Sequence, residues 1–194
     1  MTRPRPTAAD APLFAWGDAL RRARLRRRRL ARRATLLAVG TLILLGTATW
    51  PPVPRLLWNA SPSAPKGLYR VRPGAALREG DMVAAWPPAE ARRVAAARRY
   101  LPANVPLVKH VAARAGDEVC ARGGAILLNG GVIAMRRAVD GRGRPMPWWT
   151  GCRRLRGDQL FLLMTAHPAS FDGRYFGPSD AHDVIGRAQP LWTW

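Results

Sequence analysis

Residue types that carry common enzyme chemistry are scarce in this chain. Only two of its 32 basic residues are lysines, Lys66 and Lys109, and its three histidines, His110, His167 and His182, are scattered. The chain has no HExxH zinc motif, no P-loop, and no GxGxxG within a strand-and-helix pattern. The sequence therefore argues against a metal enzyme, a nucleotide enzyme and a Ser-His-Asp triad, and we expect neither a metal nor a cofactor.

Cysteine is almost as rare. The chain has two, Cys120 and Cys152, and neither lies in a metal-binding or CxxC pattern. Two such residues fit either one disulfide or two inert thiols. A single bridge is favoured if this part of the chain is exported to an oxidising compartment.

Positive charge is plentiful but unevenly placed. The formal net charge is +20, and residues 1–33 hold eleven Arg and two Asp, with nine of those Arg between Arg21 and Arg33. A nucleic-acid site would need aromatic or groove-reading elements beside the basic run, and the run has none. We interpret residues 1–33 as a basic cytoplasmic segment, loosely ordered over 1–20 and helical over 18–33, and expect no nucleic-acid partner.

An uncharged segment follows the basic run. Residues 34–50 are 17 in number, and at ~1.5 Å per residue they reach roughly 26 Å, enough for a bilayer core. The preceding arginines favour a cytoplasmic N-terminus. A cleaved signal peptide is the alternative, but its basic region would be unusually long and its cleavage site is weak. We predict an uncleaved single-pass anchor in the cell's inner membrane, with residues 51–194 in the periplasm.

The exported part is rich in turns and short apolar segments. Gly and Pro number 18 each in the chain, Asn129-Gly130 is a hairpin signal, and residues 89–101 are the one helical stretch. Segments that predict strands are 68–72, 82–86, 107–113, 118–122, 125–128, 131–134, 159–164 and 183–188. The sequence thus predicts a mainly β fold, an antiparallel β-sheet domain behind one N-terminal transmembrane helix.

Two segments carry candidate chemistry. In residues 59–70, Ser61 and Ser63 flank Pro62, which gives a stiff turn suited to a nucleophile or, alternatively, a Ser/Pro linker. On a strand, Lys109 shares a face with Leu107 and Val111, so its amine can be buried and its pKa lowered until it acts as a base. The alternative is a lysine at a strand edge with its head in water.

A third segment, residues 170–177, holds Ser170, Asp172 and Arg174. On a strand these three side chains share one face. We expect Asp172 and Arg174 to form a structural ion pair.

Taken in order, these segments resemble the signal peptidase I family of Ser/Lys proteases (S26), and most closely its TraF-type peptidases of conjugative transfer. SAPKGLYR (63–70) resembles the nucleophile box and LVKHVAARAGDEV (107–119) the lysine box. GDQLFLL (157–163) and SFDGRYFG (170–177) resemble the last two boxes. Two departures stand out: Gly173 replaces the usual Ser, and Pro62 removes a backbone donor.

The resemblance implies roles for these residues. Ser63 is the nucleophile and Lys109 its general base. Ser61 and the backbone N–H of Ser63 form the oxyanion hole, Ser170 orients the amine, and Asp172, which TraF-type enzymes also use, supports activity. Arg174 braces the same strand.

The implied function is a serine endopeptidase that processes an exported precursor, such as a pilin subunit of a conjugative or type IV secretion system. A peptidase-cyclase, in which the substrate's own amine attacks the acyl-enzyme, is a variant of this function. The alternative is a non-catalytic, membrane-anchored scaffold of a secretion channel. We also expect shallow pockets for small substrate residues, and residues 83–86 as an edge strand with which substrate pairs.

Overall fold

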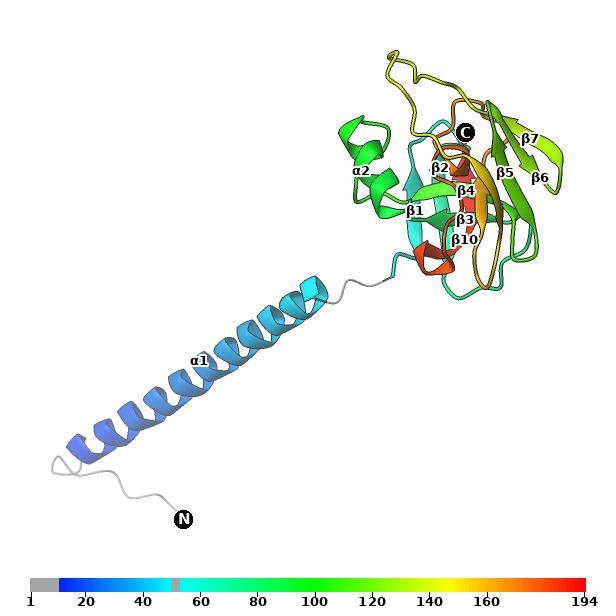
Figure 1. The fold of residues 1–194 in the computed structure, drawn as a ribbon. Coiled ribbons are helices and arrows are strands. Elements are labelled where there is room, and N and C mark those ends of the chain that lie inside the picture. Colours follow the sequence, from blue (N-terminus) through cyan, green and yellow to red (C-terminus); the bar gives the residue numbers. More distant parts are fainter. Residues whose placement is uncertain (1–10, 50–52) are drawn as a thin grey trace. The chain divides into compact units, whose positions relative to one another are not determined.

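The computed structural model describes residues 11–49 and 53–194. The chain divides into two compact units, Met1–Pro52 and Val53–Trp194. Among the described residues, the first unit contains one long helix and the second contains all the strands (Figure 1). Each unit is described by itself below.

Helix α1, Ala11–Thr49, joins the basic and the apolar segments in one element. Ala, Leu and Arg are strong helix formers, and Pro12 lies in the first turn, where proline is tolerated. The expectation that residues up to 20 are loosely ordered is therefore wrong for residues 11–20; residues 1–10 and Trp50 lie outside the described part. Within the described part, Ala15–Thr47 is the one stretch long and apolar enough to cross a membrane.

The second unit is built on two antiparallel sheets, which confirms the predicted mainly β fold. The larger has the strand order β1-β2-β10-β3-β4-β9 and the smaller β7-β6-β5-β8. The strands of the larger sheet are β1 Leu56–Asn59, β2 Gly67–Arg72, β3 Met82–Ala85, β4 Leu107–Ala113, β9 Phe161–Leu163 and β10 Val184–Thr193. Those of the smaller are β5 Glu118–Arg122, β6 Ala125–Leu128, β7 Gly131–Met135 and β8 Gly151–Arg154. Strands β1 and β8 were not among the predicted strands.

Local turn chemistry explains much of this arrangement. Asn129 and Gly130 have φ values of 49° and 87°, the left-handed pair that a two-residue hairpin requires, and they join β6 to β7 as predicted. A disulfide links Cys120 in β5 to Cys152 in β8, where the two residues are register partners. The smaller sheet is therefore cross-linked between neighbouring strands.

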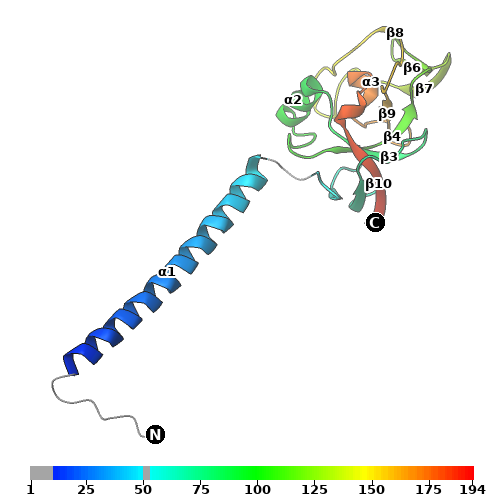
Figure 2. The same cartoon turned by 90° about the horizontal axis from the view of Figure 1, so that it is seen from below.

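Two helices and a 3-10 turn complete the unit. Helix α2, Ala89–Ala97, lies on the far side of the unit from β6 and β7 in both views (Figures 1 and 2), and ends four residues before its predicted end. Helix α3 spans Gly173–Phe176 and the 3-10 turn spans Ala181–Asp183. The prediction of a strand around 170–174 is wrong, because the Asp172 side chain accepts a hydrogen bond from the Arg174 N–H and caps α3.

The predicted substrate-pairing edge at residues 83–86 is also wrong. Strand β3 lies inside the sheet, with Val83 opposite Lys109 of β4 on one side and opposite Arg187 of β10 on the other. Both of its hydrogen-bonding edges are occupied. Because β4 is also an interior strand, the core surrounds it: Val108 belongs to one apolar cluster and Val111 to another.

Candidate active site

The turn after β1 is held by one buried side chain. The Asn59 amide donates hydrogen bonds to the carbonyls of Ser61, Ala64 and Pro65, and its oxygen accepts one from the Ser61 N–H. From β2, the Tyr69 hydroxyl donates to the same Pro65 carbonyl at 2.7 Å. Residues 61–65 are thus a braced turn that fixes Ser63 at the surface of the core, and the linker alternative does not describe them.

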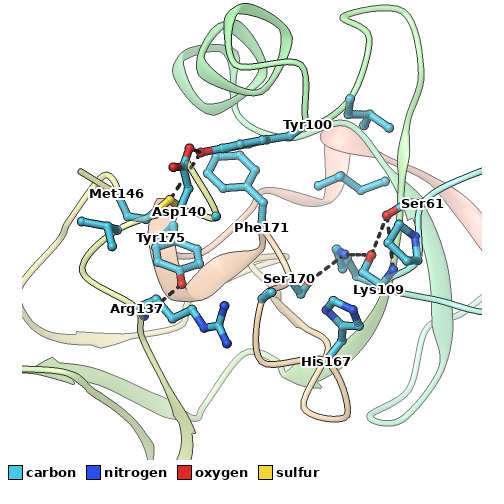
Figure 3. Close-up of a pocket in the computed structure, with 17 residues that line it drawn as sticks. Ser61, Tyr100, Lys109, Arg137, Asp140, Met146, His167, Ser170, Phe171 and Tyr175 are labelled. Carbon is cyan, nitrogen blue, oxygen red and sulfur yellow. Dashed lines mark hydrogen bonds between the residues drawn. The ribbon is translucent and has the colours of Figure 1, made fainter. Parts of the chain in front are cut away.

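Lys109 reaches this turn from the middle of the larger sheet. Its side chain is 1 % exposed, and its Nζ lies 2.7 Å from Ser63 Oγ and 2.9 Å from Ser170 Oγ (Figure 3). Burial lowers the pKa of Lys109 from 10.5 to about 8; the charge of Asp172 opposes this shift and that of Arg174 adds to it. The structure therefore brings the predicted nucleophile, base and orienting serine together, with the amine buried.

Ser61 completes the hydroxyl cluster. Its Oγ lies 2.9 Å from Ser63 Oγ and accepts a 3.4 Å hydrogen bond from the Ser63 N–H. Both predicted oxyanion donors, the Ser61 hydroxyl and the Ser63 N–H, therefore lie beside Ser63 Oγ. Pro62 stands between them without a backbone N–H to offer.

Asp172 and Arg174 form a fully buried pair, with Arg174 Nε 2.8 Å from Asp172 Oδ1. Arg174 also donates to the carbonyls of Met164, His167 and Pro168, while Asp172 accepts from the Met164 N–H. No described hydrogen bond joins either residue to Lys109 directly. The pair instead holds the loop between β9 and α3, which carries Ser170, and it influences Lys109 through its charges.

The departure at Gly173 has a packing reason. A Cβ at this position would lie 2.8 Å from the Leu162 carbonyl oxygen and 2.9 Å from the Phe161 ring. The backbone of α3 therefore approaches β9 more closely than any side chain permits. Serine does not fit here without a shift of one of these elements.

A cavity of about 270 Å³ opens beside the serine and lysine. Its walls are largely apolar and aromatic, with Leu107, Phe171 and Tyr175 among them. At the far end the Tyr100 hydroxyl donates a 2.5 Å hydrogen bond to Asp140 (Figure 3). The expected pockets for small substrate residues stay a prediction.

Sequence reasoning missed several residues of this site. His167, Tyr100, Arg137 and Asp140 all line the cavity, yet they come from loops and helix ends with no periodic signal. His167 was set aside because the three histidines are scattered along the chain. Asp172 and Arg174, five and seven residues later, are the one local sign that the loop of His167 is structured.

The described residues contain one group of three potential metal ligands: Glu118, Cys120 and Cys152. Both sulfurs of this group are joined in the disulfide. The group therefore lacks the free thiolates that a metal site there would use.

Comparison with known proteins assigns the chain to a family. Residues 27–194 match the family model described as "Signal peptidase, peptidase S26". The chain belongs to this family. The family assignment agrees with the resemblance drawn from the four sequence boxes.

Two bacterial proteins that are similar to the chain are named as transfer proteins. The chain is 36% identical over 176 residues to the "Probable conjugal transfer protein TraF" of Sinorhizobium fredii, covering 82% of this chain and 86% of the relative. It is 31% identical over 171 residues to the "Plasmid transfer protein TraF" of Escherichia coli, covering 83% and 91%. The chain is therefore a peptidase-like protein related to conjugation.

A solved signal peptidase I from Enterococcus faecalis is a more distant match. It is 17% identical, with a TM-score of 0.35, and covers 58% of this chain and 97% of its own.

Proposed function

We propose that this chain is a membrane-anchored serine endopeptidase that uses Ser63 and Lys109 to process exported precursor proteins of a conjugative transfer system. The observation that carries the proposal is the 2.7 Å contact between a buried lysine amine and a serine hydroxyl. A lysine with a pKa near 8 is uncharged in a useful fraction of molecules at neutral pH, and an uncharged amine can accept the serine proton.

The proposed acylation begins with a proton transfer from Ser63 to Lys109. When Lys109 Nζ takes the proton, Ser63 Oγ attacks the carbonyl carbon of the scissile peptide and a C–O bond forms. The negative oxygen is stabilised by the Ser63 N–H and the Ser61 hydroxyl, and each such donor is worth about 3–4 kcal/mol. The protonated Lys109 next gives its proton to the departing amine as the C–N bond breaks, which leaves Ser63 acylated.

Release of the acyl group requires a second nucleophile. In hydrolysis, water attacks the ester carbonyl while Lys109 accepts a proton from it. The C–O bond to Ser63 then breaks, and Lys109 returns the proton to Ser63 Oγ. Attack by the N-terminal amine of the same substrate gives a cyclic product instead. The two outcomes are separated by product mass, because the cyclic product lacks one water relative to the hydrolysed one.

We place the peptidase unit in the periplasm, with α1 as a single-pass inner-membrane anchor and a lipid bilayer as partner. The Arg-rich half of α1 precedes its apolar half, the order expected for a cytoplasmic N-terminus. An exposed aromatic surface formed by β1 and the C-terminal end of the chain supports this placement. Trp58, Trp192 and Trp194 are 49–65% exposed, and their ring centroids lie 5.2–6.2 Å apart.

The substrate that we propose is a pilin or a related secreted subunit, by analogy with the transfer proteins named above. Incubation of the full chain in detergent with the pilin precursor of the same conjugative system tests this. Wild type should cut the precursor, and Ser63→Ala should reduce the rate by more than about 10³-fold, because the nucleophile is lost.

Matched lysine variants separate this proposal from its rival. Lys109→Ala should abolish processing, whereas Lys66→Arg, which keeps the positive charge at the exposed position of the other lysine, should leave it intact. If Ser63→Ala and Lys109→Ala both support transfer and processing, the chain is a scaffold of the secretion channel and the peptidase proposal is wrong.

A further inference from the structure

His167 occupies a position that the mechanism above does not use. Two recesses meet at the nucleophile: the cavity described above and a second, more open one that includes Lys66, Met164 and Trp194. Three residues line both recesses, namely Pro62, Ser63 and His167. A peptide bound across Ser63 with one arm in each recess would therefore run past His167.

Backbone hydrogen bonds hold the loop that carries His167. The backbone carbonyl of His167 accepts hydrogen bonds from the Arg174 guanidinium and from the Ser170 N–H. The backbone N–H of His167 donates to the Met164 carbonyl. The same loop delivers Ser170 to Lys109. In Figure 3 the ring lies at the Lys109 and Ser170 end of the cavity, away from Tyr100 and Asp140.

The His167 ring is not used in the hydrogen bonds that hold this loop. Within the described part of the chain, neither ring nitrogen of His167 has a hydrogen-bond partner, and Nδ1 is buried without one. We assign the ring proton to Nε2, because a buried acceptor without a partner is tolerated better than a buried N–H without one. Nε2 is not among the buried unpartnered atoms, and it therefore offers a donor to the recess.

We propose that the Nε2–H of His167 donates a hydrogen bond to a substrate backbone carbonyl next to the scissile bond, and so aligns the peptide between the two recesses. This inference rests on the proposed peptidase function, and it adds a substrate-binding residue to it. A buried polar atom left without a partner costs free energy. Such a cost is common where a group is kept for binding or catalysis.

The test is a set of substitutions in the full chain, assayed with a synthetic peptide that spans the precursor cleavage site. His167→Leu should lower kcat/KM by about 10- to 100-fold, the range for one lost hydrogen bond to bound substrate. His167→Gln, whose amide nitrogen lies at the ε position, should recover most of the loss. His167→Asn, whose polar atoms lie at the δ position, should not.

Stability measurements separate substrate binding from a structural role. His167→Leu removes an unpartnered buried nitrogen, so its unfolding temperature should equal or exceed that of wild type while its activity falls. His182→Gln, at an exposed histidine in the same unit, is the matched control and should change neither quantity.

Two results would overturn the inference while leaving the peptidase intact: wild-type kcat/KM in His167→Leu, or a fall in unfolding temperature with no rescue by Gln. Ser63→Ala is run beside these variants. If Ser63→Ala retains full activity, the proposed peptidase function is wrong, and the inference about His167 is wrong with it.

Discussion

Lys109 has its chemistry because of where its side chain lies. Burial lowers the pKa of this amine from 10.5 to about 8, which corresponds to ~3 kcal/mol against the charged form. The unfolded chain therefore binds more protons than the folded one between about pH 8 and 10.5, and this group makes the fold more stable as pH rises through that window. An arginine cannot take this role, since it stays charged at every accessible pH.

The same pKa predicts the pH dependence of peptide cleavage. The neutral amine is the active form, so kcat/KM should rise about tenfold per pH unit below about 8 and level off above it. The measurement is cleavage of a peptide substrate by the full chain across this range. A flat profile between about pH 6 and 9 would contradict the assignment of Lys109 as base, and Lys109→Arg should be inactive throughout.

At the scale of elements, the loop between β9 and α3 depends on the buried Asp172–Arg174 pair. Arg174→Ala leaves a buried carboxylate without its partner, and such a loss typically costs about 3–5 kcal/mol. We expect a decrease of this size in the free energy of unfolding, measured with urea. Because the loop carries Ser170, cleavage activity should fall as well.

The control for this variant is an exposed ion pair in the same unit. Arg93 and Glu90 pair on the surface of α2, with their side chains 73% and 83% exposed. Arg93→Ala should change the free energy of unfolding by less than about 0.5 kcal/mol. Equal effects of the two substitutions would show that Arg174 does not brace its loop.

The end of strand β10 lies unusually close to the backbone of β2. A Cβ on Gly67 would lie 2.0 Å from the Trp192 carbonyl oxygen, so only glycine lets the end of β10 pack against β2. In that register Trp58 of β1 and Trp192 of β10 both lie opposite Leu68. The three residues form a row across adjacent strands, and this row is the centre of the exposed aromatic surface.

At the scale of the whole molecule, this aromatic surface predicts contact with lipid. Tryptophan favours the bilayer interface. In vesicles of phosphatidylcholine with brominated acyl chains, the tryptophan fluorescence of the full chain should be quenched. The double variant Trp58→Ser/Trp192→Ser should lose a large part of that quenching.

Trp148, 44% exposed in the same unit, provides the comparison. Its ring packs against the Arg136 guanidinium at 3.7 Å and lies outside the aromatic surface. Trp148→Ser should leave the quenching by lipid almost unchanged. A similar loss in both variants would mean that the row on β1, β2 and β10 does not meet the membrane.

Local patterns were enough to predict several features. The uncharged run after the arginines, the short apolar-rich segment 107–113 and the Asn129-Gly130 turn each depend on neighbours in the chain. They correspond to the apolar half of α1, to β4 and to the β6–β7 hairpin. Ser63 and Lys109 likewise indicated a serine nucleophile with a lysine base. Local information sufficed because helix, strand and turn preferences act over a few residues.

Only the tertiary structure decided what lies beside what. Ser63 and Lys109 are 46 residues apart, and Lys109 and Ser170 are 61 apart, yet all three side chains meet. The order of strands placed β3 inside the sheet, and the buried pair at Asp172 turned an expected strand into the start of α3. Hydrogen-bond partners across a sheet and the charge on a buried amine depend on packing between distant segments, which no local pattern encodes.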